Sequence, residues 1–190
     1  MKRVYLIHGW GGTSKSDFFL WLKNELGEKG IWNYFPDMPN TDEPRIGEWI
    51  EFLKKNIKEI DGDTILIGHS IGCQAVLRFL ETLPVGIKVK KVILVAPWLK
   101  LDEQKIKSEG EGVWEIAKPW IETPINWKKI KSHCSAFVCI FSDNDQYVSL
   151  DTKEIFRSKL NAKVVILKNR YHFDEGHGIK KLPEILKYIK

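Results

Sequence analysis

The chain lacks any long hydrophobic run. A membrane-spanning helix needs roughly 20 consecutive apolar residues, and no stretch of this sequence approaches that length. The apolar stretch Val4–Ile7 follows Lys2 and Arg3 but is too short for the apolar core of a secretion signal. We therefore expect a cytoplasmic protein without a membrane span.

Cysteine is also scarce. The three residues Cys73, Cys134 and Cys139 are an odd number, and no two of them have the C-x-x-C spacing. This pattern indicates neither a disulfide framework nor a zinc site. Reduced, mostly buried thiols are typical of a cytosolic protein.

A concentrated basic stripe is missing as well, although the formal net charge is +5. The densest run, Lys128–Lys131, contains three lysines, and most other lysines are scattered among glutamates. Nucleic-acid binding calls for a basic stripe or a known binding module. We therefore expect no nucleic-acid partner.

Short apolar runs alternate with segments of helical periodicity along the 190 residues. Runs of four to six apolar residues without polar alternation favour strands that are buried on both faces of a parallel sheet. The alternation predicts an α/β architecture, a doubly wound, mostly parallel sheet of about six strands with helices on both faces. The expected strands are Val4–Ile7, Trp32–Phe35, Thr64–Ile67, Val92–Ala96, Ala136–Phe141 and Val164–Leu167.

Helical stripes fill the intervals, and a chain of this length fits a single domain, 1–190. Ser14–Asp17 offers capping residues for the first helix. The segment 98–127 is too long for a plain crossover and contains four tryptophans, so it predicts one or two helices inserted as a small cap. The other expected helices are Phe18–Leu26, Ile46–Ile57, Ile71–Leu80, Thr152–Leu160 and Leu182–Ile189.

The strongest motif is the elbow, residues 68–72, which reads Gly-His-Ser-Ile-Gly and matches G-x-S-x-G. It follows a predicted strand and opens a predicted helix, which is the setting of a nucleophile elbow. So tight a turn leaves no room for side chains at Gly68 and Gly72, and it exposes Ser70 at the carboxyl ends of the strands. The alternative is that Ser70 is an ordinary helix N-cap.

A glycine-rich loop, His8-Gly9-Trp10-Gly11-Gly12, follows the first strand. Here the chain resembles the α/β-hydrolase superfamily, in which such a loop supplies half of the oxyanion hole. The resemblance implies that the backbone amides of Trp10 and Ile71 are the two donors. We expect His8 to be a buried structural histidine and not the general base.

The same loop has a second interpretation as a dinucleotide fingerprint. Gly9 and Gly11 fit its first two positions, and Asp37 fits the acid that binds ribose. The third position, however, is Ser14 and not glycine or alanine, and the Gly-Lys-Ser/Thr of a P-loop is absent. We therefore expect no nucleotide site.

The acid and the base should follow the fifth and the last strand, in the chain order serine, acid, histidine. The superfamily pattern D-x-x-V selects Asp145, and Asp143 is the alternative. His172 is the expected base and His177 the alternative. His133 precedes the fifth strand and lies at the wrong end of the sheet, and we expect His69 to point sideways from the elbow.

From His8 to Phe173 the chain resembles the small serine hydrolases similar to retinoblastoma-binding protein 9 and its bacterial relatives. The chain departs from that family at three positions. Gln146 and Ser149 stand where prolines are common, and Tyr171 stands where glycine commonly precedes the histidine. These departures concern the geometry of the loops more than the triad.

The resemblance implies a serine hydrolase that cleaves a carboxylic ester, a thioester or an amide through an acyl-enzyme on Ser70. Such chemistry takes a small-molecule acyl substrate and needs neither a metal nor an organic cofactor. The alternative is a catalytically weak hydrolase-fold protein that binds a protein partner, because a fold does not fix a function. Trp10 and the tryptophans of the 98–127 segment either line an acyl pocket or simply pack against the sheet.

Overall fold

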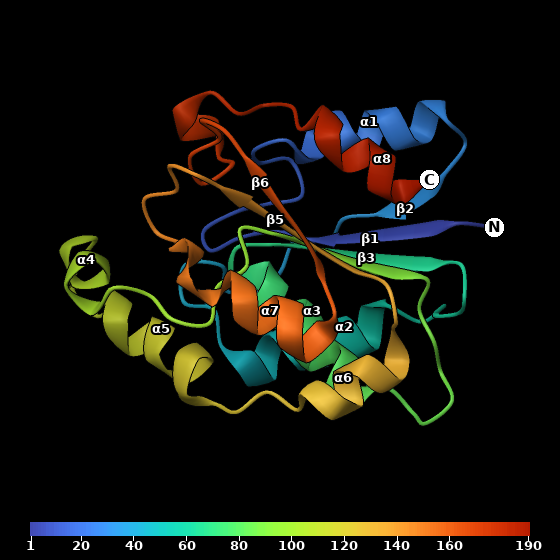
Figure 1. Cartoon of the computed structure of the whole chain (residues 1–190), viewed down its shortest axis with the longest axis horizontal. Coiled ribbons are helices and arrows are strands. Elements are labelled where there is room, and N and C mark those ends of the chain that lie inside the picture. Colours follow the sequence, from blue (N-terminus) through green and yellow to red (C-terminus); the bar gives the residue numbers. More distant parts are fainter.

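The computed structural model describes all residues, 1–190, and contains one sheet of six strands in the order β2-β1-β3-β4-β5-β6 (Figure 1). All five neighbouring pairs are parallel. This arrangement confirms the predicted parallel sheet of about six strands. The strands are β1 Arg3–Ile7, β2 Trp32–Tyr34, β3 Thr64–His69, β4 Lys91–Val95, β5 Phe137–Ser142 and β6 Lys163–Leu167.

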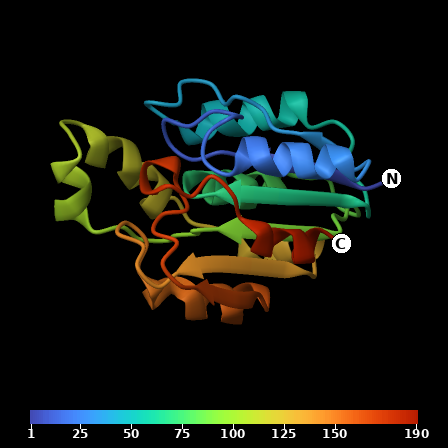
Figure 2. The ribbon, with the colours of Figure 1, turned by 90° about the horizontal axis from the view of Figure 1, so that it is seen from above.

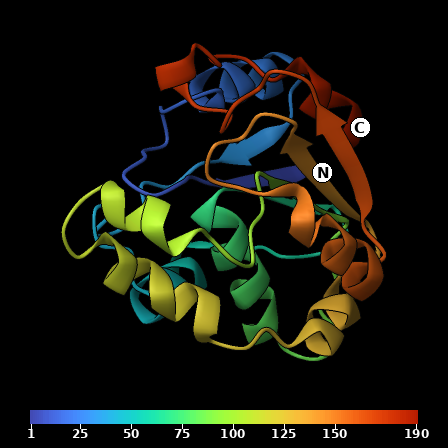
Figure 3. The ribbon, with the colours of Figure 1, turned by 60° about the vertical axis from the view of Figure 1, so that its left-hand side comes forward.

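Helices cover both faces of the sheet. The helices α1 and α8 pack on one face, and α2, α3, α6 and α7 pack on the other (Figures 1 and 3). The strand order reverses direction at β1, as a doubly wound sheet requires. The helices are α1 Phe19–Glu28, α2 Ile46–Asn56, α3 Ile71–Thr82, α4 Glu103–Ser108, α5 Val113–Glu122, α6 Trp127–His133, α7 Lys153–Leu160 and α8 Leu186–Ile189.

Two helix predictions differ from the structure. The helix α1 starts after Phe18 without any side-chain cap, because Asp17 has a left-handed backbone (φ 55°) and lies in the preceding turn. The expected helix Leu182–Ile189 is a 3₁₀ turn, Pro183–Ile185, followed by the short α8. A segment of this length has few intrahelical hydrogen bonds to offset its unpaired ends, and short 3₁₀ turns are common there.

The central strands are buried throughout. Every residue of β3 and β5 is buried, which is why these segments read as apolar runs without alternation. The edge strand β6 has several partly exposed residues. The apolar runs therefore place the middle of the sheet in the core. No helix of the chain combines the length and apolar composition needed to cross a membrane.

The 98–127 segment contains α4 and α5, which extend beyond one end of the sheet (Figure 2). Its far end is tied to the body by Arg78, a buried side chain of α3. The guanidinium donates to the carbonyls of Trp120 at 3.0 Å and Thr123 at 2.8 Å. The Trp120 indole donates to the Pro44 carbonyl and packs edge-on against Trp49, with ring centroids 5.8 Å apart. This tryptophan is therefore a packing residue.

Candidate active site

Ser70 lies at the turn between β3 and α3 with a strained backbone, φ 52° and ψ −121°. A non-glycine residue adopts such a positive φ at a cost of about 1–3 kcal/mol and does so mostly at functional sites. The residue does not cap α3 with its side chain. Its hydroxyl is instead hydrogen-bonded to His172, which excludes the interpretation of Ser70 as an ordinary N-cap.

The two glycines of the elbow are required by close backbone approach. A Cβ at Gly68 would lie 2.6 Å from the Gly72 carbonyl oxygen and 2.7 Å from the Cys73 nitrogen. A Cβ at Gly72 would lie 2.3 Å from the carbonyl oxygen of Ile7 and 2.5 Å from that of His8. The second glycine thus allows the start of α3 to pack directly on the end of β1.

His172 lies between Ser70 and Asp145. Its Nε2 is 2.9 Å from Ser70 Oγ, and its Nδ1 is 2.9 Å from Oδ2 and 3.1 Å from Oδ1 of Asp145. The Asp145 carboxylate, only 2% exposed, also accepts from the amides of Tyr147 and Val148. A carboxylate accepts hydrogen bonds and donates none, so the imidazole proton belongs on Nδ1. Nε2 is left to accept the Ser70 hydroxyl proton.

The alternative acid and base are engaged elsewhere. Asp143 Oδ1 accepts the Asn169 amide at 2.8 Å and makes no hydrogen bond with His172. His177 Nδ1 pairs with Asp174 at 2.8 Å, and its ring stacks on Tyr171. The structure therefore brings Asp145 and His172 to Ser70, and it does not bring Asp143 or His177 there.

The turn after β5 holds the loop after β6 through its side chains. The side chains of residues 142–144, at the end of β5 and in the turn after it, accept the amides of three consecutive loop residues at 2.8–3.0 Å. The next residue along each segment continues the series, because Asp145 accepts from the His172 ring. The pairs are Asp143 with Asn169, Ser142 with Arg170 and Asn144 with Tyr171.

Both neighbours of His172 have left-handed backbones, φ 47° at Tyr171 and φ 60° at Phe173. This conformation is the one that glycine adopts freely, so a glycine before the histidine would fit here without strain. Tyr171 takes the same backbone conformation because its amide is held by Asn144. The departure noted in the sequence therefore places a tyrosine at a position whose backbone conformation favours glycine.

Trp10 and Ile71 both line the cavity above Ser70. The loop that carries Trp10 is fixed by hydrogen bonds from the Gly11 amide to the Thr41 carbonyl and from the Gly12 amide to the Gly9 carbonyl. The indole of Trp10 is anchored by a bond from its Nε1 to the Asp42 carbonyl at 2.9 Å. Its position in the cavity wall is thus set by the surrounding backbone.

His8 is a buried structural residue in this arrangement. Its Nδ1 donates to the Gly9 carbonyl at 2.7 Å, and its Nε2 accepts from the Met38 amide at 2.9 Å. Burial lowers the pKa of His8, since desolvation disfavours the charged ring. A neutral imidazole with both nitrogens occupied holds the glycine loop and has no free nitrogen for a substrate.

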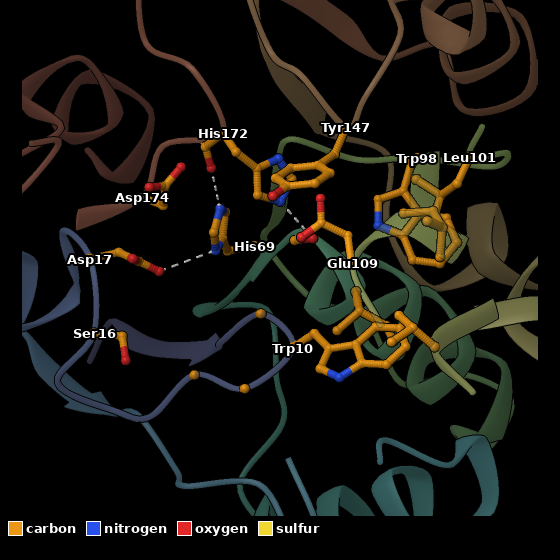
Figure 4. Close-up of a pocket in the computed structure, with 17 residues that line it drawn as sticks. Trp10, Ser16, Asp17, His69, Trp98, Leu101, Glu109, Tyr147, His172 and Asp174 are labelled. Carbon is orange, nitrogen blue, oxygen red and sulfur yellow. Dashed lines mark hydrogen bonds and ion pairs between the residues drawn. The ribbon is translucent and has the colours of Figure 1, made fainter. Parts of the chain in front are cut away.

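The cavity above Ser70 has a volume of about 480 Å³ (Figure 4). Trp10, Trp98 and Leu101 form an apolar side, and Asp17 and Asp174 lie on the opposite, polar side. The 98–127 segment contributes Ile106 of α4, Glu109 just after α4 and Val113 of α5 to the wall. The 98–127 segment therefore encloses the space next to the serine.

The electrostatic character of the cavity differs from that of the whole chain. The chain has 30 lysines and arginines, yet none lines the cavity, whereas Asp17, Glu109 and Asp174 do. Burial raises the pKa of Asp174, but hydrogen bonds from His177 outweigh this effect and bring the pKa below its ordinary value. Nowhere in residues 1–190 do three or more His, Cys, Asp or Glu side chains gather so that they could hold a metal ion.

The three cysteines are free and buried. Burial raises the pKa of the thiols of Cys73, Cys134 and Cys139, because desolvation disfavours the thiolate. None of them lines the cavity. Ser70, by contrast, lines the cavity with its hydroxyl hydrogen-bonded to a histidine.

His69 and Asp17 are site residues that the sequence analysis missed. His69 Nε2 lies 2.8 Å from the His172 carbonyl oxygen, and its Nδ1 lies 3.6 Å from Asp17 Oδ2 (Figure 4). The expectation that His69 points sideways excluded it as a base but gave it no role. The sequence signal that could have pointed to His69 was a histidine at the end of a mostly apolar strand.

The fold, the elbow and the spacing of the three side chains define a hydrolase of the α/β-hydrolase superfamily. A model of the family described as Serine hydrolase matches residues 4–190. The chain belongs to this serine hydrolase family, which confirms the resemblance seen in the sequence.

Two individual relatives align with nearly the whole chain. YdeN of Bacillus subtilis is 28% identical over 182 residues, covering 96% of this chain and 91% of YdeN. Serine hydrolase RBBP9 of Rattus norvegicus is 25% identical over 185 residues, covering 96% of this chain and 86% of RBBP9.

Solved structures agree with the fold. The crystal structure of the ydeN gene product from B. subtilis matches with a TM-score of 0.88 and 27% identity, covering 100% of this chain and 98% of that one. Est1E from Butyrivibrio proteoclasticus matches with a TM-score of 0.70 and 16% identity, covering 100% and 87% of the two chains. At that identity Est1E supports the shared fold alone.

Replacing Gly72 with alanine should weaken the fold. The new Cβ would overlap the backbone oxygens of Ile7 and His8, which cannot rotate away, so we expect Gly72→Ala to lower the free energy of unfolding by about 3 kcal/mol. Urea unfolding followed by circular dichroism measures this change. The matched control is Gly27→Ala in α1, where a Cβ meets nothing within 4 Å and should stabilise by about 0.5–1 kcal/mol. Equal changes in the free energy of unfolding at the two positions would contradict the close approach of Gly72 to the Ile7 and His8 carbonyls.

Proposed function

We propose that the chain hydrolyses a carboxylic ester through an acyl-enzyme on Ser70, with His172 as general base and Asp145 as its partner. The observation that carries this proposal is the pair of short contacts around one imidazole, 2.9 Å to Ser70 Oγ and 2.9 Å to Asp145 Oδ2. The strained backbone of Ser70 and the serine hydrolase family give independent support.

In the acylation step, Ser70 Oγ attacks the acyl carbonyl carbon while its proton passes to His172 Nε2. The resulting imidazolium is stabilised by Asp145, which already receives the Nδ1 proton and two backbone amides. His172 then returns the proton to the departing alcohol. Because the ring is preset in the Nδ1–H tautomer, no proton rearrangement is needed before attack.

The backbone amides of Trp10 and Ile71 stabilise the negative charge that develops on the carbonyl oxygen. Both residues line the cavity beside Ser70, and Ile71 opens α3, so its amide also benefits from the positive end of the helix. In deacylation, His172 takes a proton from a water molecule, which attacks the acyl carbon and releases a carboxylic acid. Thioesters and amides fit the same sequence of steps.

We propose further that the 98–127 segment acts as a cap that selects the substrate. The segment supplies Ile106, Glu109 and Val113 to the cavity wall. A volume of about 480 Å³ suits a small molecule. The apolar side formed by Trp10, Trp98 and Leu101 favours an apolar acyl or alcohol group.

A fluorophosphonate should form one covalent adduct on the wild-type protein, read by intact mass. Ser70→Ala should form none, and His172→Ala should react slower by about 10²-fold or more, since the general base is lost. Both side chains line the cavity, so we expect both variants to fold, and circular dichroism can check this. No adduct on the folded wild-type protein would contradict the proposal and favour a protein-binding role.

The two aspartates of the β5 turn provide a matched pair. Asp145→Asn should lower kcat on a nitrophenyl ester by on the order of 10³- to 10⁴-fold, because an amide stabilises the wrong tautomer of His172. Asp143→Asn keeps an oxygen that accepts the Asn169 amide, so its kcat should change little. Steady-state kinetics decides the assignment, and a larger loss at Asp143 would reverse it.

The carboxylates of the cavity should discriminate against anionic esters. Among nitrophenyl esters of similar length, one whose acyl chain ends in a carboxylate should have a kcat/KM at least about 10-fold below that of a neutral ester, because like charges repel at short range. Glu109→Gln should narrow the difference, and so should added salt. Equal rates for anionic and neutral esters at low salt would show that these carboxylates do not govern selection.

A further inference from the structure

We propose that His69 is a positioning residue that holds His172 against Ser70 by donating a hydrogen bond from its Nε2 to the His172 backbone carbonyl. This inference rests on the proposed function. The bond is 2.8 Å long and joins residues 103 positions apart in the chain. It links the elbow directly to the loop that carries the base, independently of the bond between His172 and Ser70 themselves.

The His69 ring has little freedom to turn. Its side chain is 3% exposed. The rings of Phe18 and Phe19 meet it edge-on, with centroids 5.9 and 5.6 Å away. On another side, a Cβ at Gly9 would lie 3.2 Å from Nδ1. The packing therefore fixes the direction in which Nε2 points, toward the His172 carbonyl.

The loop that carries His172 needs such a contact because its backbone is strained on both sides of that residue. Tyr171 and Phe173 both have positive φ, which costs L-residues roughly 1–2 kcal/mol each. The turn after β5 holds the amides before His172. His69 holds the carbonyl of His172 itself, and the Phe173 amide of the same peptide plane donates to the Arg170 carbonyl at 2.8 Å.

Asp17 holds the same loop at a second point. Its Oδ1 accepts the Glu175 amide at 3.0 Å, while its Oδ2 faces His69 Nδ1 at 3.6 Å. The loop is thus held at residue 172 by His69 and at residue 175 by Asp17. His69 Nδ1 makes no hydrogen bond, so the connection to His172 depends on Nε2 alone.

The test compares three substitutions of His69 by steady-state kinetics on a neutral nitrophenyl ester. His69→Leu removes the donor and should lower kcat by about 10- to 100-fold, because misplacing a catalytic group by about 1 Å has effects of that size. KM should stay within about twofold, because His69 acts through His172 on the chemical step and not on substrate binding. His69→Gln places an amide donor near the Nε2 position and should restore most of kcat.

His69→Asn is the matched control, because it is equally polar but too short to reach the His172 carbonyl, and it should resemble His69→Leu. It also keeps the inference testable if the leucine variant fails to fold. Equal kcat for the asparagine and glutamine variants would overturn the positioning role, and so would a loss of thermal stability without a loss of kcat.

The outcome is separable from the proposed function. If the wild-type protein forms no fluorophosphonate adduct, the acyl-enzyme proposal fails at that point. If the wild-type protein reacts and folded His69→Leu reacts at the same rate, the acyl-enzyme proposal stands and the positioning role of His69 is wrong.

Discussion

The contact between the start of α3 and the end of β1 is the constraint on which the site depends. Gly72 lies so close to the carbonyls of Ile7 and His8 that no side chain fits between them. This approach brings two segments 60 residues apart into one structure, since the glycine loop follows β1 and Ser70 precedes α3. Ser70 and both candidate oxyanion donors are therefore placed by a single packing contact, and the strain at Ser70 persists because the surrounding sheet holds it.

A second set of contacts places His172, the proposed base. The side chains of the β5 turn accept the amides of the β6 loop one after another, and the Asp145–His172 pair is the last of this series. Short polar side chains that bond to nearby backbone are typical of turns. Here they bond across two neighbouring strands, so the parallel sheet fixes the distance from acid to base. A loop with positive φ on both sides of His172 is held in one conformation as a result.

The sequence predicted the sheet well because strands buried on both faces read as uninterrupted apolar runs, as in β3 and β5. Chain order and strand ends pointed to Ser70, Asp145 and His172, which the structure brings together. The contacts of His69 and Asp17 could not be predicted beyond the signal of a histidine at the end of a buried strand, because they depend on how three loops fold over one another. A tyrosine at position 171 does not indicate a left-handed backbone either. The shortness of the terminal helix α8 depends on the unpaired backbone groups at its ends, which the periodicity of apolar residues does not reveal.

The cavity has walls from two separate stretches of the chain. The serine, its base and the glycine loop come from strand ends, whereas one side comes from α4 and α5, and α5 is anchored at its far end by Arg78. Insertions or substitutions between residues 99 and 113 can therefore change the size and polarity of the chamber while the reacting groups keep their places. Divergence among such proteins, and engineering of this one, can proceed on the cap with the chemistry held constant.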